Sequence, residues 1–161
     1  ESTFSEAASD AAARSFSGKT GYLVEIGSAE ENQAVFDGVM EMVGDIVASI
    51  PYANDGGSAA YIWTGGTDQS EEGVWMWQDS GEQFWDGGAA GSPVAGVYSN
   101  WGKDSSGTQK EPDDYQMSQD GLGMALESWP WGSSDYLGSA SEWNDIDLKN
   151  ALYYLVEFDT E

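Results

Sequence analysis

Lys-Glu-Pro-Asp-Asp-Tyr-Gln-Met-Ser-Gln-Asp, residues 110–120 (KEPDDYQMSQD), is the stretch on which the interpretation of this chain depends. It places four carboxylates and two carboxamides around a single proline. In an acidic chain such a run is by default a solvated surface. Pro112 restricts the local backbone, however, and can point the side chains of Glu111 and Asp113 the same way, most effectively if its peptide bond is cis. The stretch is therefore either a charge run or part of a binding site.

A second oxygen-rich motif, Trp143-Asn144-Asp145, bears on this choice. Calcium takes about six to eight oxygen ligands from carboxylates, amide carbonyls and water. The two segments together would supply five such side chains: Glu111, Asp113, Gln119, Asn144 and Asp145. The pair of motifs favours a calcium site over a solvated face.

The composition excludes several kinds of functional site. The 161 residues include no cysteine and no histidine, which rules out disulfides, thiolate metal sites, a cysteine nucleophile and imidazole-bound zinc. The remaining metal chemistry uses oxygen ligands, which suit calcium, magnesium or manganese. A net charge of −24 makes nucleic acids and anionic lipid surfaces poor partners, because both are negatively charged.

The aromatic content indicates that this acidic chain folds. Eight Trp, eight Tyr and five Phe supply the core that a disordered acidic segment lacks. We expect a single domain over residues 1–161, because this length suits one core. The chain begins at Glu1 without methionine or a signal peptide, so we expect it to be excised from a larger polypeptide. No apolar stretch reaches 18 residues, so membrane insertion is not expected.

Two helices are predicted near the start of the chain. Thr3 and Glu6 have the spacing of a capping box, and an apolar stripe follows them as far as Ala12. Ser28 and Glu31 have the same spacing. Apolar residues at helical intervals follow through Val47, so the second helix is expected to end shortly before Pro51.

The rest of the chain predicts short strands. Apolar runs separated by Gly, Ser and Asp lie at Tyr22–Ile26, Tyr61–Trp63, Val74–Trp77, Leu122–Leu126 and Tyr153–Phe158. Helices followed by short strands indicate an α+β fold with a mainly antiparallel sheet. The stretch 81–114 is expected to carry little regular structure, and loops of that length usually serve a function.

Two further oxygen-rich clusters have simpler interpretations. Asn54-Asp55-Gly56-Gly57 supplies the residues that a tight turn needs. Thr67-Asp68 with Glu71-Glu72 is typical of a solvated loop. We expect neither cluster to be a metal site.

Short motifs follow one another from one end of the chain to the other: Thr3-Phe4-Ser5-Glu6-Ala7, Ser28-Ala29-Glu30-Glu31-Asn32, Ile62-Trp63-Thr64-Gly65-Gly66, Trp75-Met76-Trp77 with Asp79, Tyr98-Ser99-Asn100-Trp101, Glu111-Pro112-Asp113, Trp143-Asn144-Asp145 and Tyr154-Leu155-Val156-Glu157. In this order they resemble the C-type lectin-like domain over nearly its full length. The resemblance implies an α+β fold in which two helices flank small antiparallel sheets and a long loop region carries a calcium site.

The resemblance also implies a ligand set and a sugar-binding mode. Calcium would be held by Glu111, Asp113, Gln119, Asn144 and Asp145, with the Glu111–Pro112 bond cis. Two vicinal sugar hydroxyls would complete the calcium shell and contact the same side chains. The triplet Glu-Pro-Asp is a hybrid of the family's two sugar-specifying forms, and Gln119 stands where a Glu is usual. Glu111 at the first position leads us to expect fucose, mannose or glucose. Asp114 is a candidate ligand of an auxiliary calcium ion.

The chain departs from the family's pattern in two other ways. The family's cysteines are replaced by Ala11, Gly121, Leu148 and Val156, so packing must replace the crosslinks. The usual strand before the opening helix is missing, so the last strand must lack its neighbour or recruit one from elsewhere.

The segment 127–136 (ESWPWGSSDY) is unusually rich in aromatic residues. It is either an insertion packed on its own side chains or a platform that stacks on sugar rings beside the calcium site. On the second interpretation Trp129, Trp131 and Tyr136 would bind an oligosaccharide. The tryptophans at 63, 75 and 77 are expected to be structural.

We therefore expect a non-catalytic, calcium-dependent lectin module. Its partners would be glycans on host or neighbouring cells, and its setting a large secreted bacterial surface adhesin of the RTX type. The alternative is an ice- or protein-binding domain of the same fold without sugar binding. A two-carboxylate glycosidase is the third possibility, but no acid here stands in a recognisable catalytic context.

Overall fold

The computed structural model describes residues 1–159; the last two residues of the expected domain 1–161 lie outside this range. Helix α1 spans Phe4–Ala13, and Thr3 and Glu6 form the predicted capping box, in which Glu6 accepts a hydrogen bond from the Thr3 N–H at 2.9 Å. None of the helices described is long and apolar enough to cross a membrane.

Helix α2 spans Ala29–Val43 and begins as predicted, with the Ser28 hydroxyl accepting the Glu31 N–H at 3.1 Å. The predicted end of this helix is wrong. Gly44 adopts a φ of 49°, which ends the α-helix because a residue with positive φ cannot continue it. A 3₁₀ helix, η1 (Gly44–Ser49), carries the chain on to Pro51.

The strands form two sheets, in the orders β1-β2-β11 and β7-β6-β5-β4-β8-β9. Two short strands, β3 and β10, also pair with β4. The bounds of the strands are β1 (Ser15–Phe16), β2 (Lys19–Leu23), β3 (Tyr52–Ala53), β4 (Ala59–Thr67), β5 (Val74–Trp77), β6 (Gln83–Asp86), β7 (Ser92–Pro93), β8 (Gly121–Ala125), β9 (Trp143–Ile146), β10 (Tyr153–Tyr154) and β11 (Val156–Phe158).

The pairings are antiparallel apart from β10 with β4, so the α+β prediction with a mainly antiparallel sheet is confirmed. The stretch 81–114 is more regular than expected, because β6 and β7 lie within it. The last strand does have a neighbour: β11 pairs with β2 through Val156 and Leu23.

The core lies around the large sheet and is mainly aromatic. Trp63, Trp75 and Trp77 are buried, as expected of structural residues. Packing also fills positions where the resemblance would place cysteines. A Cβ on Gly121 would lie 2.7 Å from Cδ2 of Leu148, so the two residues are in direct contact without a crosslink.

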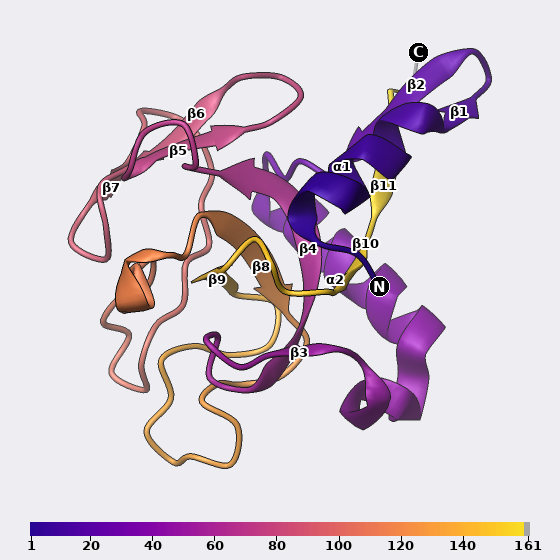
Figure 1. The fold of residues 1–161 in the computed structure, drawn as a ribbon. Coiled ribbons are helices and arrows are strands. Elements are labelled where there is room, and N and C mark those ends of the chain that lie inside the picture. Colours follow the sequence, from indigo (N-terminus) through magenta and orange to yellow (C-terminus); the bar gives the residue numbers. More distant parts are fainter. Residues whose placement is uncertain (160–161) are drawn as a thin grey trace.

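The small sheet and the candidate site lie at different ends of the molecule. Figure 1 shows α1 and the sheet of β1, β2 and β11 on one side, and the segment that contains residues 110–120 on the other. The loops before and after β8 and β9 gather at this second end, where the candidate site lies.

Candidate functional site

Pairing between β8 and β9 brings the two predicted motifs together. Asn144 lies opposite Gly123 and Asp145 opposite Leu122 in an antiparallel register. The loop before β8 carries residues 111–119 and returns alongside β9, where Asp145 accepts the N–H of Asp113 at 3.1 Å.

Three carboxylates converge at this point. Glu111, Asp113 and Asp145 each offer an oxygen, and these oxygens lie within 4.8 Å of one another. Glu111 and Asp145 are 2% and 0% exposed, whereas Asp113 reaches the surface. The Glu111–Pro112 bond is cis, as the resemblance implies. We refer to these three residues as the carboxylate triad.

Hydrogen bonds hold the triad from the protein side. Asp145 accepts the N–H of Asp113 with Oδ1 and that of Asp114 with Oδ2, the latter at 2.7 Å. Glu111 accepts the indole N–H of Trp129 on Oε1 at 3.0 Å. Its second oxygen, Oε2, is buried without a hydrogen-bond partner among the described residues. A buried carboxylate oxygen with no donor calls for a proton or a cation.

The electrostatics of the triad agree with this geometry. Burial raises the pKa of Glu111, and the negative charges of Asp145 and Asp113 raise it further. Burial also raises the pKa of Asp145, although the backbone N–H of Asp114 opposes the effect. The arrangement therefore disfavours three simultaneous negative charges unless a cation compensates them.

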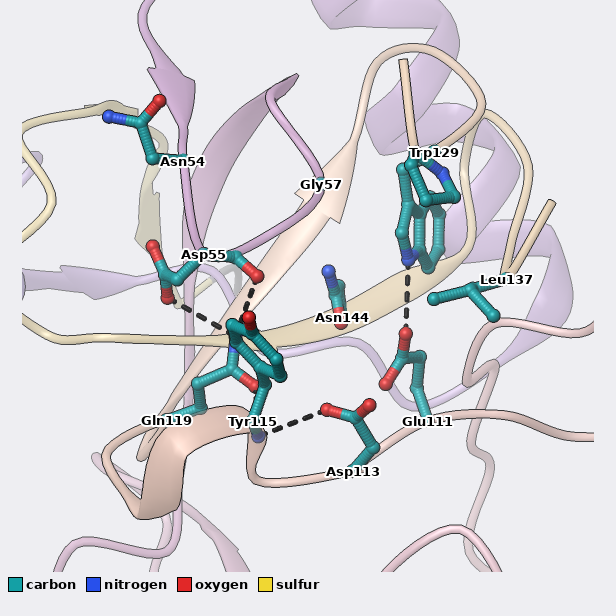
Figure 2. A pocket seen from close by; sticks show the side chains of 11 residues that line it. Asn54, Asp55, Gly57, Glu111, Asp113, Tyr115, Gln119, Trp129, Leu137 and Asn144 are labelled. Atoms are coloured by element: carbon teal, nitrogen blue, oxygen red, sulfur yellow. Dashed lines mark hydrogen bonds between the residues drawn. The ribbon is translucent and has the colours of Figure 1, made fainter. Parts of the chain in front are cut away.

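The two predicted carboxamides lie at the same pocket (Figure 2). Asn144 donates through Nδ2 to the Tyr61 hydroxyl at 2.9 Å. Gln119 accepts the N–H of Tyr115 on Oε1 at 2.6 Å and donates through Nε2 to the Asp55 carboxylate at 3.1 Å. The pocket has a volume of about 220 Å³ and gathers the triad members Glu111 and Asp113 with both carboxamides.

Asp55 is a residue of this site that the sequence interpretation missed. The turn at 54–57 is present as predicted, but the Asp55 carboxylate also accepts the N–H of Asp147 at 2.7 Å and the amide of Asn150 at 2.8 Å. It thus joins Gln119 to the segment after β9. The sequence does not reveal these contacts, because the contacting residues lie far apart along the chain and an Asp is common in turns.

The three aromatic residues predicted to form a platform lie in different places. Trp129 is 1% exposed, so the prediction that it stacks on a sugar is wrong: its ring is enclosed, and its N–H holds Glu111. Trp131 is 67% exposed and lines a neighbouring pocket with Tyr52. Tyr136 is 38% exposed.

A second acidic group consists of Asp68, Glu72 and Asp120, close to Asp114. The interpretation of Asp68 as part of a solvated loop is wrong, because this residue is 2% exposed and its Oδ1 has no hydrogen-bond partner among the described residues. Burial raises the pKa of Asp68 to about 7, and the charges of Glu72 and Asp120 add to the effect. Burial and the charge of Asp114 likewise raise the pKa of Glu72.

The backbone between the two acidic groups is held in an uncommon conformation. Asp114, Gln116 and Met117 have φ values of 47°, 63° and 57°. Left-handed backbone costs free energy for residues other than glycine and gathers at functional sites. Asp114 offsets part of this cost by accepting the Gln119 N–H on its carboxylate at 3.2 Å.

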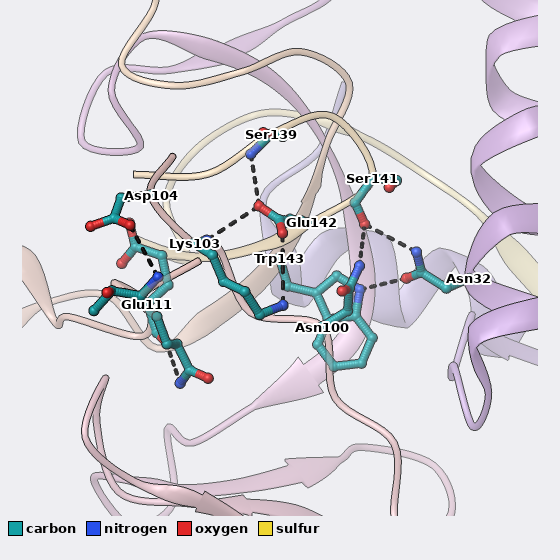
Figure 3. A network of polar contacts seen from close by, with 11 residues as sticks. Asn32, Asn100, Lys103, Asp104, Glu111, Ser139, Ser141, Glu142 and Trp143 are labelled. Atoms are coloured by element: carbon teal, nitrogen blue, oxygen red, sulfur yellow. Dashed lines mark hydrogen bonds and ion pairs between the residues drawn. The ribbon is translucent and has the colours of Figure 1, made fainter. Parts of the chain in front are cut away.

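A polar network behind the site fixes β9 against its surroundings (Figure 3). The Trp143 indole donates to Asn32 of α2 at 2.7 Å, and Asn32 in turn donates to the Ser141 carbonyl. Glu142 accepts the backbone N–H groups of Lys103 and Ser139. Helix α2 and the loop at 103 therefore position the strand that carries Asn144 and Asp145.

Comparison with known proteins relates the fold to a structural class. No family model matches the chain, and no curated protein matches it in sequence. Solved structures do match. The C-type lectin CEL-I from Cucumaria echinata is 21% identical with a TM-score of 0.61, covering 99% of this chain and 85% of the other.

Two other structures have the same architecture. The carbohydrate-recognition domain of the mouse scavenger receptor C-type lectin is 22% identical with a TM-score of 0.52, covering 96% of this chain and 78% of that domain. A calcium-independent type II antifreeze protein is 19% identical with a TM-score of 0.51, covering 96% and 76%. Together with the two helices and the antiparallel sheets, these matches show that the chain has the C-type lectin-like fold.

Proposed function

We propose that the chain is a calcium-dependent glycan-binding module. The ion would be held by the triad of Glu111, Asp113 and Asp145 together with the carbonyl oxygens of Gln119 and Asn144. The observation that carries the proposal is the unpartnered Oε2 of Glu111, buried among like charges. Oxygen ligands of this kind and number suit calcium.

The bound ion would supply the attraction for sugar hydroxyls. A hydroxyl oxygen on calcium is polarised and becomes a stronger donor to a neighbouring carboxylate. Asp113 is the exposed member of the triad and offers such an acceptor at the surface. Vicinal hydroxyls of a sugar are the proposed ligands, and Glu111 at the first position of its motif favours the fucose, mannose or glucose type.

An auxiliary calcium site is proposed at the second acidic group. Asp114 is its predicted ligand. Burial raises the pKa values of Glu72 and Asp120, and the negative charge of Asp114 raises both further. Burial also raises the pKa of Asp68, and the charges of Glu72 and Asp120 add to that effect. The buried, unpartnered Oδ1 of Asp68 supports this assignment as Glu111 Oε2 supports the first.

The proposed setting is extracellular, as part of a secreted bacterial adhesin of the RTX type that contacts glycans on other cells. A net charge of −24 and the lack of cysteine support this setting, because such a surface stays soluble and needs no disulfide chemistry. We propose binding rather than catalysis as the activity.

A glycan array probed with and without calcium tests the proposal. Binding in millimolar calcium that disappears on chelation is expected; binding that is unchanged by the chelator would contradict it. Asp145→Asn should lose both calcium and glycan binding, while Asp86→Asn at the exposed end of β6 removes the same charge and should retain both. If the chain binds ice crystals or a protein and binds no glycan on the array, the alternative function is favoured.

A further inference from the structure

A second pocket lies directly beside the candidate site. It has a volume of about 360 Å³, and its polar and aromatic walls are Tyr52, Asn54, Ser58, Glu127 and Trp131. Asn54 also lines the pocket that contains Glu111 and Asp113. The two pockets therefore adjoin each other at Asn54.

Two exposed aromatic side chains line this second pocket. Trp131 is 67% exposed and Tyr52 is 60% exposed. They come from segments far apart in the sequence, one from the loop after β8 and one from β3. Large aromatic faces left in water beside hydrogen-bonding groups are typical of a binding surface.

The loop that carries Trp131 is firmly held. The N–H of Trp131 donates to the Gly57 carbonyl at 2.8 Å. A Cβ on Gly57 would lie 2.9 Å from Cα of Pro130, so the two backbones pack in direct contact. The Trp129 ring fills the space over Gly102 and Gly138, where any Cβ would overlap it. Trp131 is thus presented on a fixed support, which lowers the entropy cost of binding.

The same support joins the second pocket to the triad. The Trp129 indole that anchors this loop donates to Oε1 of Glu111. Trp131 follows only two residues later. The loop therefore fixes a carboxylate of the candidate calcium site and an exposed aromatic face at the same time.

We propose that the second pocket is a subsite for the next sugar unit of a neutral oligosaccharide whose terminal unit occupies the first pocket; this inference rests on the proposed function. Pyranose rings have apolar C–H faces that pack on aromatic rings and hydroxyl edges that bond to amides, hydroxyls and carboxylates. The second pocket offers both kinds of group through Trp131, Tyr52, Asn54 and Ser58.

The negative charge around the two pockets and their volumes both favour a neutral oligosaccharide as the ligand. Glu127 lines the second pocket and Asp55 the first, in a chain of net charge −24, so sialylated or sulfated sugars would be repelled. The first pocket, at about 220 Å³, is smaller than the roughly 300 Å³ at the lower end of small-ligand sites. The second pocket extends the site into that range.

The test compares an oligosaccharide with its own terminal unit. The unmodified chain is first screened in millimolar calcium on an array of neutral and anionic oligosaccharides and monosaccharides. Affinities for the best neutral oligosaccharide and for its terminal monosaccharide are then measured by calorimetry. Trp131→Ala and Tyr52→Ala are each expected to weaken oligosaccharide binding by about tenfold while monosaccharide affinity stays unchanged. Phe16→Ala is the matched control, because Phe16 is also 67% exposed but lies on β1 in the other sheet.

The outcomes separate this inference from the proposed function. If the unmodified chain shows no calcium-dependent glycan binding, the proposed function fails and the subsite fails with it. If calcium-dependent binding is found but Trp131→Ala keeps the full preference for the oligosaccharide, or if the best ligand is anionic, the subsite alone is overturned. Equal weakening of monosaccharide and oligosaccharide would also overturn it, because Trp131 would then act on the first pocket.

Discussion

Glu111→Gln is expected to stabilise the metal-free protein while removing its response to calcium. Glu111 is 2% exposed, and its ordinary pKa is 4.5. If it folds protonated at pH 7, taking up the proton costs about 3.4 kcal/mol. If it folds ionised, its repulsion with one carboxylate within 4.8 Å costs at least about 3.5 kcal/mol at an effective dielectric constant of about 20. In either ionisation state, Glu111 therefore lowers the free energy of unfolding by about 3 kcal/mol.

A glutamine at this position needs no proton and has no charge to repel its neighbours. It also keeps the hydrogen bond to Trp129. Its carbonyl oxygen can still accept the Trp129 indole N–H, and its amide can donate to the carboxylates of Asp113 and Asp145. We therefore expect a gain of about 3 kcal/mol at pH 7 without calcium, or a melting temperature higher by about 6 to 12 °C for a chain of this length. With calcium at 100 times its Kd, the native protein should gain about 2.7 kcal/mol and the variant much less.

The assay is thermal unfolding from pH 5 to 9, with chelator and again with calcium. The folded pKa of Glu111 is raised, so the folded state binds more protons and the native protein should lose stability as the pH rises from about 4.5. The free energy of unfolding of the Glu111→Gln variant should fall less over the same pH range. Glu82→Gln, which removes an exposed acid in the connection between β5 and β6, should behave like the native protein. A Glu111→Gln variant that is less stable than the native protein in chelator at pH 7 would refute the reasoning.

Three further perturbations test the support of the site. Calcium affinity should fall between pH 8 and pH 5, because protons compete for carboxylates whose pKa values are raised; calorimetry that finds a constant affinity would contradict this. Trp129→Phe keeps most of the ring but removes the donor to Glu111, so terbium or calcium titrations should show about tenfold weaker binding, and an unchanged Kd would argue against the contact. Gly138→Ala places a methyl group in the Trp129 ring and should cost about 2 kcal/mol, whereas Gly38→Ala in open space on α2 should be neutral or stabilising.

Local signals and motif order were sufficient to predict much of the fold. The capping residues Thr3 and Ser28 mark helix starts because caps act within a few residues of themselves. The apolar spacing through Val47 does not reveal the end of α2, because the spacing continues across Gly44 into the 3₁₀ helix. The pairing of residues 111–113 with 144–145 was predicted from the oxygen ligands that the two segments share and from the resemblance, since no local signal specifies which strands become neighbours.

The contacts that depend on distant residues could not be predicted. Asp55 and Asp68 looked like loop acids, yet the first joins Gln119 to Asn150 and the second is buried. Trp129 and Trp131 are chemically alike and two residues apart, but one is enclosed and the other exposed. What separates them is the space over Gly102 and Gly138, which exists only once the chain has folded.

The negative charge of the carboxylate triad affects both the stability of the fold and the proposed binding of calcium. In the described part of the chain, each ion pair that is formed lies elsewhere, joining Arg14, Lys103, Lys110 and Lys149 to Asp10, Glu142, Asp104 and Asp147. Among the described residues, the triad is therefore contacted by N–H donors without a charged partner: the Trp129 indole and the backbone N–H groups of residues 113, 114 and 115. Dipoles orient the carboxylates but do not cancel their charge, so a proton or a metal ion must do so. The acids proposed to bind the ion are then the same acids that destabilise the ion-free fold, and stability should depend on calcium more steeply than at a site neutralised by lysine.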